Sequence, residues 1–304
     1  MFEFNGECTC RWIRLMYTHI VTSPQYPSPI KIVFVDLDGT LVNKSDTISP
    51  GNAAAIRAAQ SRGVVFVLST GRIPYMAEPI AAQIGRTGYG VFSNGSVILN
   101  WETNDILRRQ PVPMTAAKRA AEIAFTYGLA PLFFGANIES DLGRSVYADT
   151  RIPLVPSYLE RNAHRVVYTD LTADTFDSQP TTVEFLSDRE TVFNFLDILR
   201  LEFGNSVTLN TGYLPRYESW LVGLNAAGVS KAASAQILID HLGLPHSATL
   251  AIGDQSNDID LLKWAAVGIC MGDGSEEAQA AADHLTGTFE QDGVAQALDR
   301  FVLS

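Results

Sequence analysis

Residues 32–41 read IVFVDLDGTL, an apolar run that leads directly into two aspartates one residue apart and then a glycine. Four consecutive apolar residues are typical of a strand that is buried on both faces of a parallel sheet. Open parallel sheets bind ligands in a crevice at the carboxyl ends of their strands. The run therefore predicts an α/β fold in which Asp36 and Asp38 lie in that crevice.

The two aspartates would point the same way, because side chains in an extended chain alternate with period two. Like charges so close repel, and the pair needs a cation, a shared proton, or both. Gly39 would let the backbone turn and approach an anion without steric penalty. The alternative interpretation is a polar turn after a strand, because Asp and Gly commonly form turns.

The composition is that of a globular protein with more than one domain. The chain has 304 residues, of which 46% are hydrophobic and 18% are charged. No run of about 18 or more apolar residues predicts a membrane span. The formal net charge of -11 argues against nucleic acid and anionic membranes as partners, since both attract a basic surface. An anionic substrate would therefore need a local positive site.

The chain has only three cysteines, a low number that fits a reducing cytoplasm, where we expect the protein to reside. Cys8 and Cys10 have no second Cys or His pair nearby, so we expect no zinc site there. Cys270 lies in an apolar run that predicts a core position. Residues 1–28 hold no apolar segment of signal-peptide type, and we expect them to be a poorly ordered extension without a functional role. The sequence indicates no particular oligomeric state.

Strand and helix signals alternate in two separate parts of the chain. The predicted strands are 32–35, 64–70, 90–95, 248–252 and 267–271, and the predicted helices are 50–62, 75–84, 230–242 and 258–265. Such alternation implies a parallel sheet with right-handed crossovers.

Between these parts, from about residue 101, the pattern changes to short strands with only two helices, at 115–127 and 188–203. Runs of strands with few helices are typical of an antiparallel α+β module. We therefore predict a Rossmann-like parallel sheet core with an inserted α+β cap domain. The expected core is 29–100 and 226–304, and the expected cap, which would set substrate specificity, is 101–225.

A second acidic cluster, GDQSND at residues 253–258, follows the predicted strand at 248–252. The same crevice argument brings Asp254 and Asp258 toward the first two aspartates. Four acids gathered at one sheet edge would repel strongly. A hard divalent cation bound through oxygen ligands, Mg²⁺ above all, resolves that repulsion.

Helix capping would explain part of the second cluster without a metal. Ser256 or Asn257 could be the N-cap of the following helix, and the helix dipole would favour Asp258. Capping does not explain Asp254, so the metal interpretation accounts for more of the segment.

Two further segments could hold a phosphate group. Lys231 begins a predicted helix, and a lysine beside free helix N–H groups is a strong arrangement for binding anions. Thr70-Gly71-Arg72 follows a predicted strand, where the hydroxyl could donate to a phosphate oxygen and the glycine would allow close approach. A solvated surface lysine and an ordinary strand-to-helix turn are the alternatives.

The order of these segments resembles the haloacid dehalogenase superfamily. Within it, the chain resembles the Cof-type phosphatases, which carry a large α/β cap between the second and third motifs. Other segments match Cof-type signatures, namely Ser93-Asn94-Gly95, Gly228-Val229-Ser230-Lys231, Cys270-Met271-Gly272 and Asp292-Gly293-Val294-Ala295. The resemblance covers residues 30 to 300 and departs at Gly272-Asp273-Gly274, where Cof-type proteins usually have Gly-Asn-Ala.

The resemblance implies a role for each site residue. Asp36 would be the nucleophile that forms an aspartyl-phosphate, and Asp38 would be the general acid/base, with its backbone carbonyl helping to hold Mg²⁺. Asp36 and Asp254 would bind Mg²⁺ directly, with Asp258 in support. The groups around the phosphate would be Thr70, Gly71, Arg72, Lys231 and Asn257.

The implied function is a Mg²⁺-dependent phosphatase that acts on small phosphorylated metabolites, with sugar phosphates as the first expectation. A phosphosugar mutase would share every core motif, but such mutases usually carry a small helical cap earlier in the chain. Only about 30 residues separate Asp38 from Thr70, which leaves little room for one. A transport ATPase usually has Thr in place of Asp38.

A non-catalytic phosphate-binding sensor is the remaining alternative. Such a protein would be expected to have lost Asp36, Asp38, Lys231 or Asp254, and all four are present. The phosphatase hypothesis requires Asp254 and Lys231 within about 10 Å of the Asp36 carboxylate. In the cap, Tyr147, His164 and Tyr213 are candidates for substrate contacts, although packing or surface exposure would explain each equally well.

Overall fold

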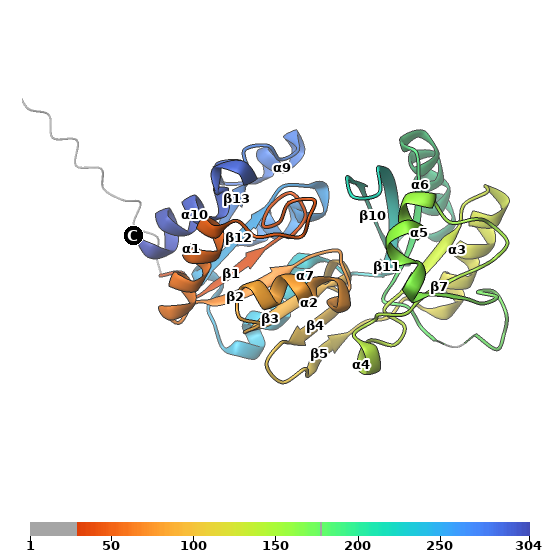
Figure 1. Ribbon diagram of the computed structural model, residues 1–304, viewed down its shortest axis with the longest axis horizontal. Helices are drawn as coiled ribbons and strands as arrows, with labels where there is room; N and C mark the ends of the chain where they lie inside the picture. Colours follow the sequence, from red (N-terminus) through yellow and green to blue (C-terminus); the bar gives the residue numbers. More distant parts are fainter. Residues whose placement is uncertain (1–28, 177) are drawn as a thin grey trace, which may run out of the picture.

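The computed structural model describes residues 29–176 and 178–304. The expectations for residues 1–28, including those for Cys8 and Cys10, lie outside the described residues. The chain forms two lobes, each built on one sheet (Figure 1). The core lobe combines the two ends of the described chain, coloured orange and blue, and the cap lobe is formed by the middle, coloured yellow to green.

The core lobe contains an 8-stranded sheet in the order β14-β13-β12-β1-β2-β3-β4-β5. All neighbours from β14 to β3 pair in parallel, as predicted, and β4 and β5 add an antiparallel edge. In chain order the strands are β1 (Ile32–Val35), β2 (Val65–Ser69), β3 (Tyr89–Phe92), β4 (Val97–Asn100), β5 (Ile106–Arg109), β12 (Thr249–Gly253), β13 (Val267–Cys270) and β14 (His284–Leu285).

Helices cover both faces of this sheet. Val33 and Val35 of β1 belong to the apolar cluster on one face, and Ile32 and Phe34 belong to the cluster on the other. The first cluster includes α1 (Pro50–Ser61), α2 (Pro74–Gln83) and α10 (Gly293–Leu298), and the second includes α7 (Lys231–Leu242), α8 (Ile259–Trp264) and α9 (Glu276–Ala281). The central strand is therefore buried on both sides, which explains its unbroken apolar run.

The cap lobe contains a 6-stranded sheet in the order β10-β11-β9-β6-β7-β8. Its strands are β6 (Pro131–Phe134), β7 (Val146–Ala148), β8 (Val166–Tyr168), β9 (Thr182–Ser187), β10 (Val207–Leu214) and β11 (Ser219–Ala226). One face packs against α3 (Met114–Thr126) and α6 (Arg189–Phe203). The other face packs against α5 (Pro156–Asn162) and against Ile73 of the core lobe, so this second face looks toward the core.

Two parts of the sequence prediction need correction. Strand β5 pairs with β4 in the core sheet, although the sequence placed residues from 101 onward in the cap. The hairpin was missed because its second strand, with sequence ILRR, is only half-buried and carries no apolar run. The cap also contains two helices that the sequence did not predict, α4 (Ile138–Asp141) and α5. They were missed because both are too short to show a periodic pattern. We propose that the inserted unit begins after Arg109.

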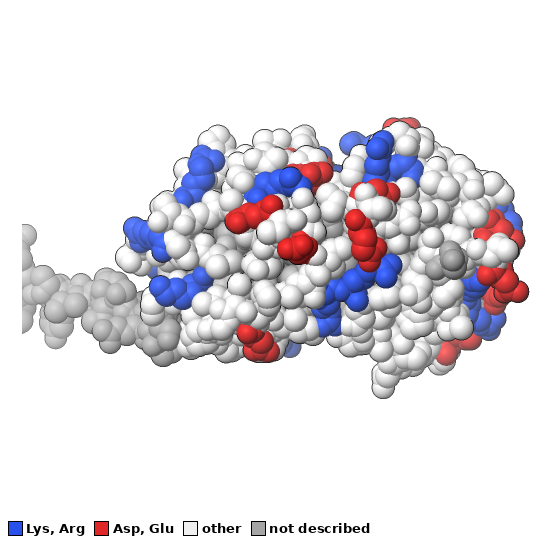
Figure 2. Space-filling model, turned by 90° about the horizontal axis from the view of Figure 1, so that it is seen from below, with Lys and Arg blue, Asp and Glu red and all other residues white. Residues whose placement is uncertain are grey.

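The surface and the helices bear on possible partners. Figure 2 shows one face of the protein, on which basic and acidic side chains are interspersed and form no continuous basic surface. Among the described residues, no helix combines the length and apolarity that crossing a membrane requires.

Candidate active site

The register of the core sheet brings the ends of neighbouring strands together. Val35 of β1 lies opposite Ile252 of β12 and Leu68 of β2. Asp36 and Asp254 therefore leave the sheet at the same edge, which is where open parallel sheets bind ligands.

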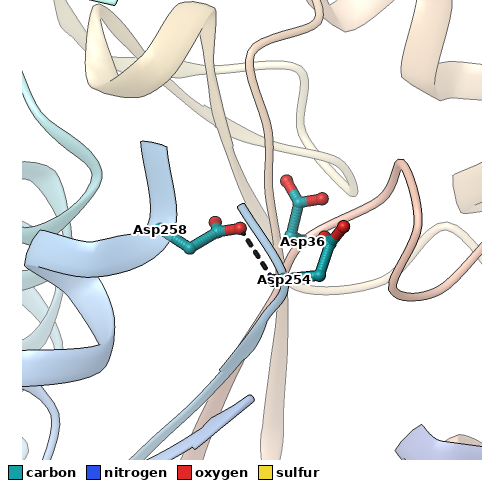
Figure 3. Close-up of side chains that lie close together, drawn as sticks. All are labelled: Asp36, Asp254 and Asp258. Carbon is teal, nitrogen blue, oxygen red and sulfur yellow. Dashed lines mark hydrogen bonds between the residues drawn. The ribbon is translucent and has the colours of Figure 1, made fainter. Parts of the chain in front are cut away.

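Three buried aspartates meet at this edge (Figure 3). Asp36 and Asp254 are 5% exposed and Asp258 is 0% exposed. One carboxylate oxygen from each lies within 4.8 Å of the others. Asp258 ends a 3₁₀ turn, Ser256–Asp258, that follows β12, and its carboxylate points back toward the backbone of Asp254. Three carboxylates in such a buried cluster need counter-charge.

Lys231 supplies part of that counter-charge. It is the first residue of α7, directly after the N-cap Ser230. Its ammonium group is buried and contacts Asp36 Oδ1 at 2.6 Å and Asp258 Oδ1 at 2.5 Å. Burial would lower the pKa of Lys231, but the two carboxylates outweigh it and raise that pKa, so the ammonium stays protonated.

Asp258 orients its neighbours. One of its oxygens accepts from the ammonium group, and the other accepts the backbone N–H groups of Asp254 at 3.0 Å and Gln255 at 3.1 Å. The predicted caps, Ser256 and Asn257, are wrong. Gln255 is the N-cap instead, because its side chain and that of Asp258 form a reciprocal capping box.

When Asp36 and Asp254 are ionised, the Lys231 ammonium does not offset all of their negative charge. Burial raises the pKa of Asp36 and outweighs the opposing charge of Lys231. Burial and the charge of Asp258 raise the pKa of Asp254 to about 7, although the Thr40 hydroxyl donates to Asp254 Oδ1 at 2.8 Å. Two buried carboxylates with uncompensated charge at the rim of a cavity fit Mg²⁺, which prefers oxygen ligands.

Gly39 lets the Asp254 carboxylate lie against the turn that follows Asp36. Its φ is +88°, a conformation that favours glycine, and a Cβ at this position would overlap the Asp254 carboxylate. The glycine after the two aspartates is therefore required by the close approach of a side chain from β12.

Asp38 lies beside Arg72. The guanidinium donates from Nε to Asp38 Oδ2 at 2.8 Å and from Nη2 to Asp38 Oδ1. The Asp38 side chain is 46% exposed, and its partial burial would raise its pKa, but the hydrogen bonds and the charge of Arg72 outweigh this and hold that pKa below its usual range. Arg72 also pairs with Asp46 at 2.8 Å, and its Nη1 has no hydrogen-bond partner among the described residues. One buried donor of Arg72 is therefore unsatisfied within the described residues.

The other residues predicted to surround a phosphate lie on the wall of one cavity. Thr70, Gly71 and Asn257 line it, together with Asn94, which accepts a hydrogen bond from Asn257 Nδ2 at 3.2 Å. The Thr70 hydroxyl accepts the backbone N–H of Arg72, so its own proton can be donated. Asp36, Asp38, Arg72 and Asp254 also line this cavity, whereas Lys231 and Asp258 do not.

The cavity has a volume of about 680 Å³ and continues from the core lobe into the cap lobe. The cap contributes Phe134, Tyr158, Glu184, Leu186, Leu221 and residues 210–217 of the β10–β11 hairpin. Of the three cap candidates named from the sequence, Tyr213 lines the cavity. Tyr147 accepts a hydrogen bond from Asn137, His164 is exposed, and neither lines the cavity. The volume leaves room for a substrate much larger than phosphate.

Contacts that the sequence did not predict connect the cap to the catalytic edge. Arg216, in the β10–β11 hairpin, pairs with Asp46, which also pairs with Arg72. The Ser256 hydroxyl donates to the Thr211 carbonyl at 3.1 Å. Asp46 and Arg216 lie in irregular segments, 170 residues apart, and no periodicity marks either of them. The contact of the Thr40 hydroxyl with Asp254 could have been predicted, because Thr40 lies directly after the aspartate motif.

Comparison with known proteins places the chain in a family. It matches the model of the haloacid dehalogenase-like hydrolase family over residues 33–298. It is 27% identical to a 5-amino-6-(5-phospho-D-ribitylamino)uracil phosphatase of Bacillus subtilis, over 90% of this chain and 96% of that protein. It is 26% identical to the chloroplastic endoribonuclease YBEY of Arabidopsis thaliana, where 91% of this chain spans only 47% of that protein.

A solved structure gives the same picture for the fold. A haloacid dehalogenase-like hydrolase from Bacteroides thetaiotaomicron superposes with a TM-score of 0.74 at 27% identity, over 89% of this chain and 99% of that one. The chain therefore belongs to the haloacid dehalogenase-like hydrolase family, as the motifs predicted. Its inserted cap sheet and its relatives place it among the Cof-type phosphatases of this family.

Proposed function

We propose that the chain is a Mg²⁺-dependent phosphatase that hydrolyses small phosphate monoesters, sugar phosphates foremost, through an aspartyl-phosphate on Asp36. The observation that carries this proposal is the buried cluster in which Lys231 bridges Asp36 and Asp258 beside Asp254. Lys231 occupies Asp36 Oδ1, so Oδ2 is the oxygen that would attack a phosphoryl group in the cavity.

Asp36 and Asp38 would divide the chemistry between them. Asp36 Oδ2 forms a bond to phosphorus while the bond from phosphorus to the ester oxygen breaks, and Asp38 gives its proton to that oxygen. Water then attacks phosphorus, Asp38 takes up the proton of the water, and inorganic phosphate leaves with Asp36 restored. The contact of Asp38 with Arg72 favours the ionised carboxylate that this second step needs, so the first step requires Asp38 to have taken up a proton from solvent beforehand.

The remaining polar groups would hold the phosphoryl oxygens. Phosphoryl transfer spreads negative charge over the equatorial oxygens, and donors in a buried site stabilise it more strongly than water does. The Thr70 hydroxyl and Asn257, which line the cavity, would take this role together with Lys231, whose ammonium lies behind Asp36, and Arg72 Nη1 is a further buried donor. Gly71 keeps the wall beside Thr70 open.

Asp36 and Asp254, with the backbone carbonyl of Asp38, would hold Mg²⁺, and Asp258 would support them by fixing the backbone at Asp254. When bound, the ion supplies positive charge that offsets the charge on the phosphoryl group. The cap closes the other side of the cavity, which limits the access of bulk water.

The test is release of inorganic phosphate from para-nitrophenyl phosphate with Mg²⁺ and with EDTA. We expect turnover with Mg²⁺, loss of turnover in EDTA, and a decrease of about three decades or more in the Asp36→Asn variant. Asp197→Asn, which changes an exposed aspartate of the cap, is the matched control and is expected to retain full activity. If wild type and Asp36→Asn release phosphate equally, the proposal fails; phosphate binding without turnover would indicate a sensor.

A panel of phosphate esters would then define the natural substrate. It should contain sugar phosphates, nucleotides, flavin mononucleotide, pyridoxal phosphate and the ribitylaminouracil phosphate on which the Bacillus relative is named to act. Sugar phosphates are expected to give the highest kcat/KM. A clear preference for another class would replace them in the proposal.

A further inference from the structure

One carboxylate of the cap, that of Glu184, lines the cavity from a face of β9 that it shares with Leu186 and the buried Thr182. Alternate residues of β9 pack against α3 and α6, whereas Glu184 and Leu186 lie on the opposite face, which lines the cavity. Directly opposite Glu184 in the sheet are Leu132 of β6 and Gly223 of β11. Gly223 carries no side chain on this face, and a Cβ there would lie in van der Waals contact with Glu184 Cγ at 3.9 Å and Thr182 Oγ1 at 3.8 Å.

The Glu184 carboxylate has no hydrogen bond and no ion pair among the described residues. Burial raises its pKa to about 7, and the nearby charge of Arg165 lowers it only in part. The guanidinium of Arg165 is directed elsewhere, since Nε donates to Asn162 Oδ1 at 2.9 Å and Nη1 donates to the Arg144 carbonyl at 3.3 Å. A half-buried carboxylate without a donor is a costly feature, and a ligand that donates to it would remove the cost.

A second polar group lies in the same part of the cavity without a partner. Tyr158 is 2% exposed and lines the cavity, and its hydroxyl makes no hydrogen bond of normal geometry among the described residues. Its ring is fixed by Phe134 and Tyr217, with ring centroids 6.4 Å and 5.3 Å away. Leu186, which lies on the same face of β9 as Glu184, packs in one apolar cluster with Tyr158, and this contact places Tyr158 beside that face. Two unpaired polar groups in one apolar pocket indicate a ligand that pairs with them.

We propose that Glu184 and Tyr158 form a subsite for the end of the substrate that lies away from its phosphate, and that this end carries an N–H or O–H donor. The inference rests on the proposed function, because it assigns the leaving-group side of the same cavity. Glu184 accepts from the donor, Tyr158 donates to or accepts from the same end group, and the Phe134 and Leu186 side chains cover its apolar part.

The subsite also sets what the enzyme rejects. A leaving group that ends in a second phosphate or a carboxylate would meet the negative charge of Glu184, which the charge of Arg165 offsets in part. The substrate class is therefore a monophosphate whose organic part is long enough to reach the cap and ends in hydroxyl or amine groups.

Three phosphate esters of similar length test this assignment. Hexyl phosphate has no donor at its far end, 6-aminohexyl phosphate has N–H donors, and glucose 6-phosphate has O–H donors. Wild type is expected to show a kcat/KM about tenfold or more higher for one or both donor-bearing esters than for hexyl phosphate. The ester that benefits identifies whether the donor is an amine or a hydroxyl.

Variants then assign the preference to the subsite. Glu184→Leu, which suits the surrounding apolar face, is expected to abolish the preference and to change hexyl phosphate turnover less than about threefold. Tyr158→Phe, which removes only the hydroxyl, is expected to reduce the preference about threefold to tenfold. Glu160→Leu, which changes an exposed glutamate of α5 outside the cavity, is the control and should keep it.

The outcomes separate the subsite from the phosphatase proposal. A preference that survives Glu184→Leu, or no preference in a wild type that hydrolyses all three esters, overturns the subsite alone. An equal loss for all three esters in Glu184→Leu also overturns it, because the residue would then be structural. Hydrolysis of none of the esters, at the level of Asp36→Asn, overturns the proposed function as well.

Discussion

Arg72 holds the Asp38 carboxylate through two hydrogen bonds, and through Asp46 it also connects that carboxylate to the cap. Asp46 accepts from both Arg72 and Arg216, and Arg216 belongs to the β10–β11 hairpin. A chain of charged groups therefore runs from the cap to the residue proposed as the general acid/base. The position of the cap and the orientation of Asp38 are linked by this chain.

Arg216→Ala should disturb catalysis more than stability. The variant removes the ion pair between Arg216 and Asp46, so Asp46 is held by Arg72 alone. We therefore expect kcat/KM for para-nitrophenyl phosphate to fall about threefold to thirtyfold. Arg200→Ala, which removes an exposed pair with Asp197 within α6, should have no effect on activity. Steady-state kinetics and melting temperatures of both variants check this. Equal activity of Arg216→Ala and wild type would show that the charged chain has no catalytic role.

Asp38→Asn should remove most of the acid/base assistance while leaving the fold intact. We expect turnover to decrease by about two to four decades, which is the usual contribution of a positioned acid/base group. The decrease should be smaller for para-nitrophenyl phosphate than for an alkyl phosphate, because nitrophenolate is a better leaving group that needs less protonation. A change below about threefold for both substrates would mean that Asp38 has another role.

Lys231→Met should destabilise the protein as well as inactivate it. The variant leaves Asp36 and Asp258 buried without their shared cation, and breaking such a pair typically costs about 3–5 kcal/mol. Urea unfolding in the absence of metal measures this free energy. Lys263→Met, which changes an exposed lysine of α8, is the control. A loss below about 1 kcal/mol would contradict the view that Lys231 neutralises the acidic cluster.

Glu184→Gln should change how stability depends on pH. The pKa of Glu184 in the folded protein is about 7, above its ordinary value of 4.5, so the folded state favours the protonated carboxyl. Stability that this group contributes at low pH is therefore lost as the pH rises through about 7. The melting temperature of the variant should equal that of wild type near pH 4.5 and lie about 2–4 °C above it near pH 8.5. Arg165 and Tyr158, the other charged or titratable groups near Glu184, are the same in both proteins. A difference in melting temperature that does not vary with pH would contradict the raised pKa.

The sequence predicted those parts of the site that follow strongly patterned strands. The apolar runs before Asp36 and Asp254 identified β1 and β12, and the rule that parallel strands end at one edge brought the two aspartates together. The same pattern could not predict β5, a half-buried strand at the sheet edge. The sequence prediction also missed β4, although Val97, Ile98 and Leu99 form a buried apolar run. Periodicity identifies elements through the burial of one face, so short and partly exposed elements escape it.

Contacts from the cap escaped the sequence for a different reason. Arg216 and Glu184 become informative only through their surroundings. Arg216 pairs with Asp46, and Glu184 lines the cavity with no hydrogen bond to its carboxylate among the described residues. In the sequence, Glu184 is one acidic residue in an alternating strand, where a charged residue usually marks the solvent face. Only the position of the core lobe beside that face shows that it lines a cavity.

The most direct test of the central claim is to identify the residue that carries phosphate during turnover. Wild-type protein turning over a good substrate with Mg²⁺ is quenched rapidly with acid and cleaved with trypsin, which releases the peptide from Ile32 to Lys44. We predict a phosphate adduct on this peptide that fragmentation assigns to Asp36, and that is absent from Asp36→Asn. An adduct on another residue, or sustained phosphate release with no adduct at any quench time while Asp36→Asn remains active, would contradict the account.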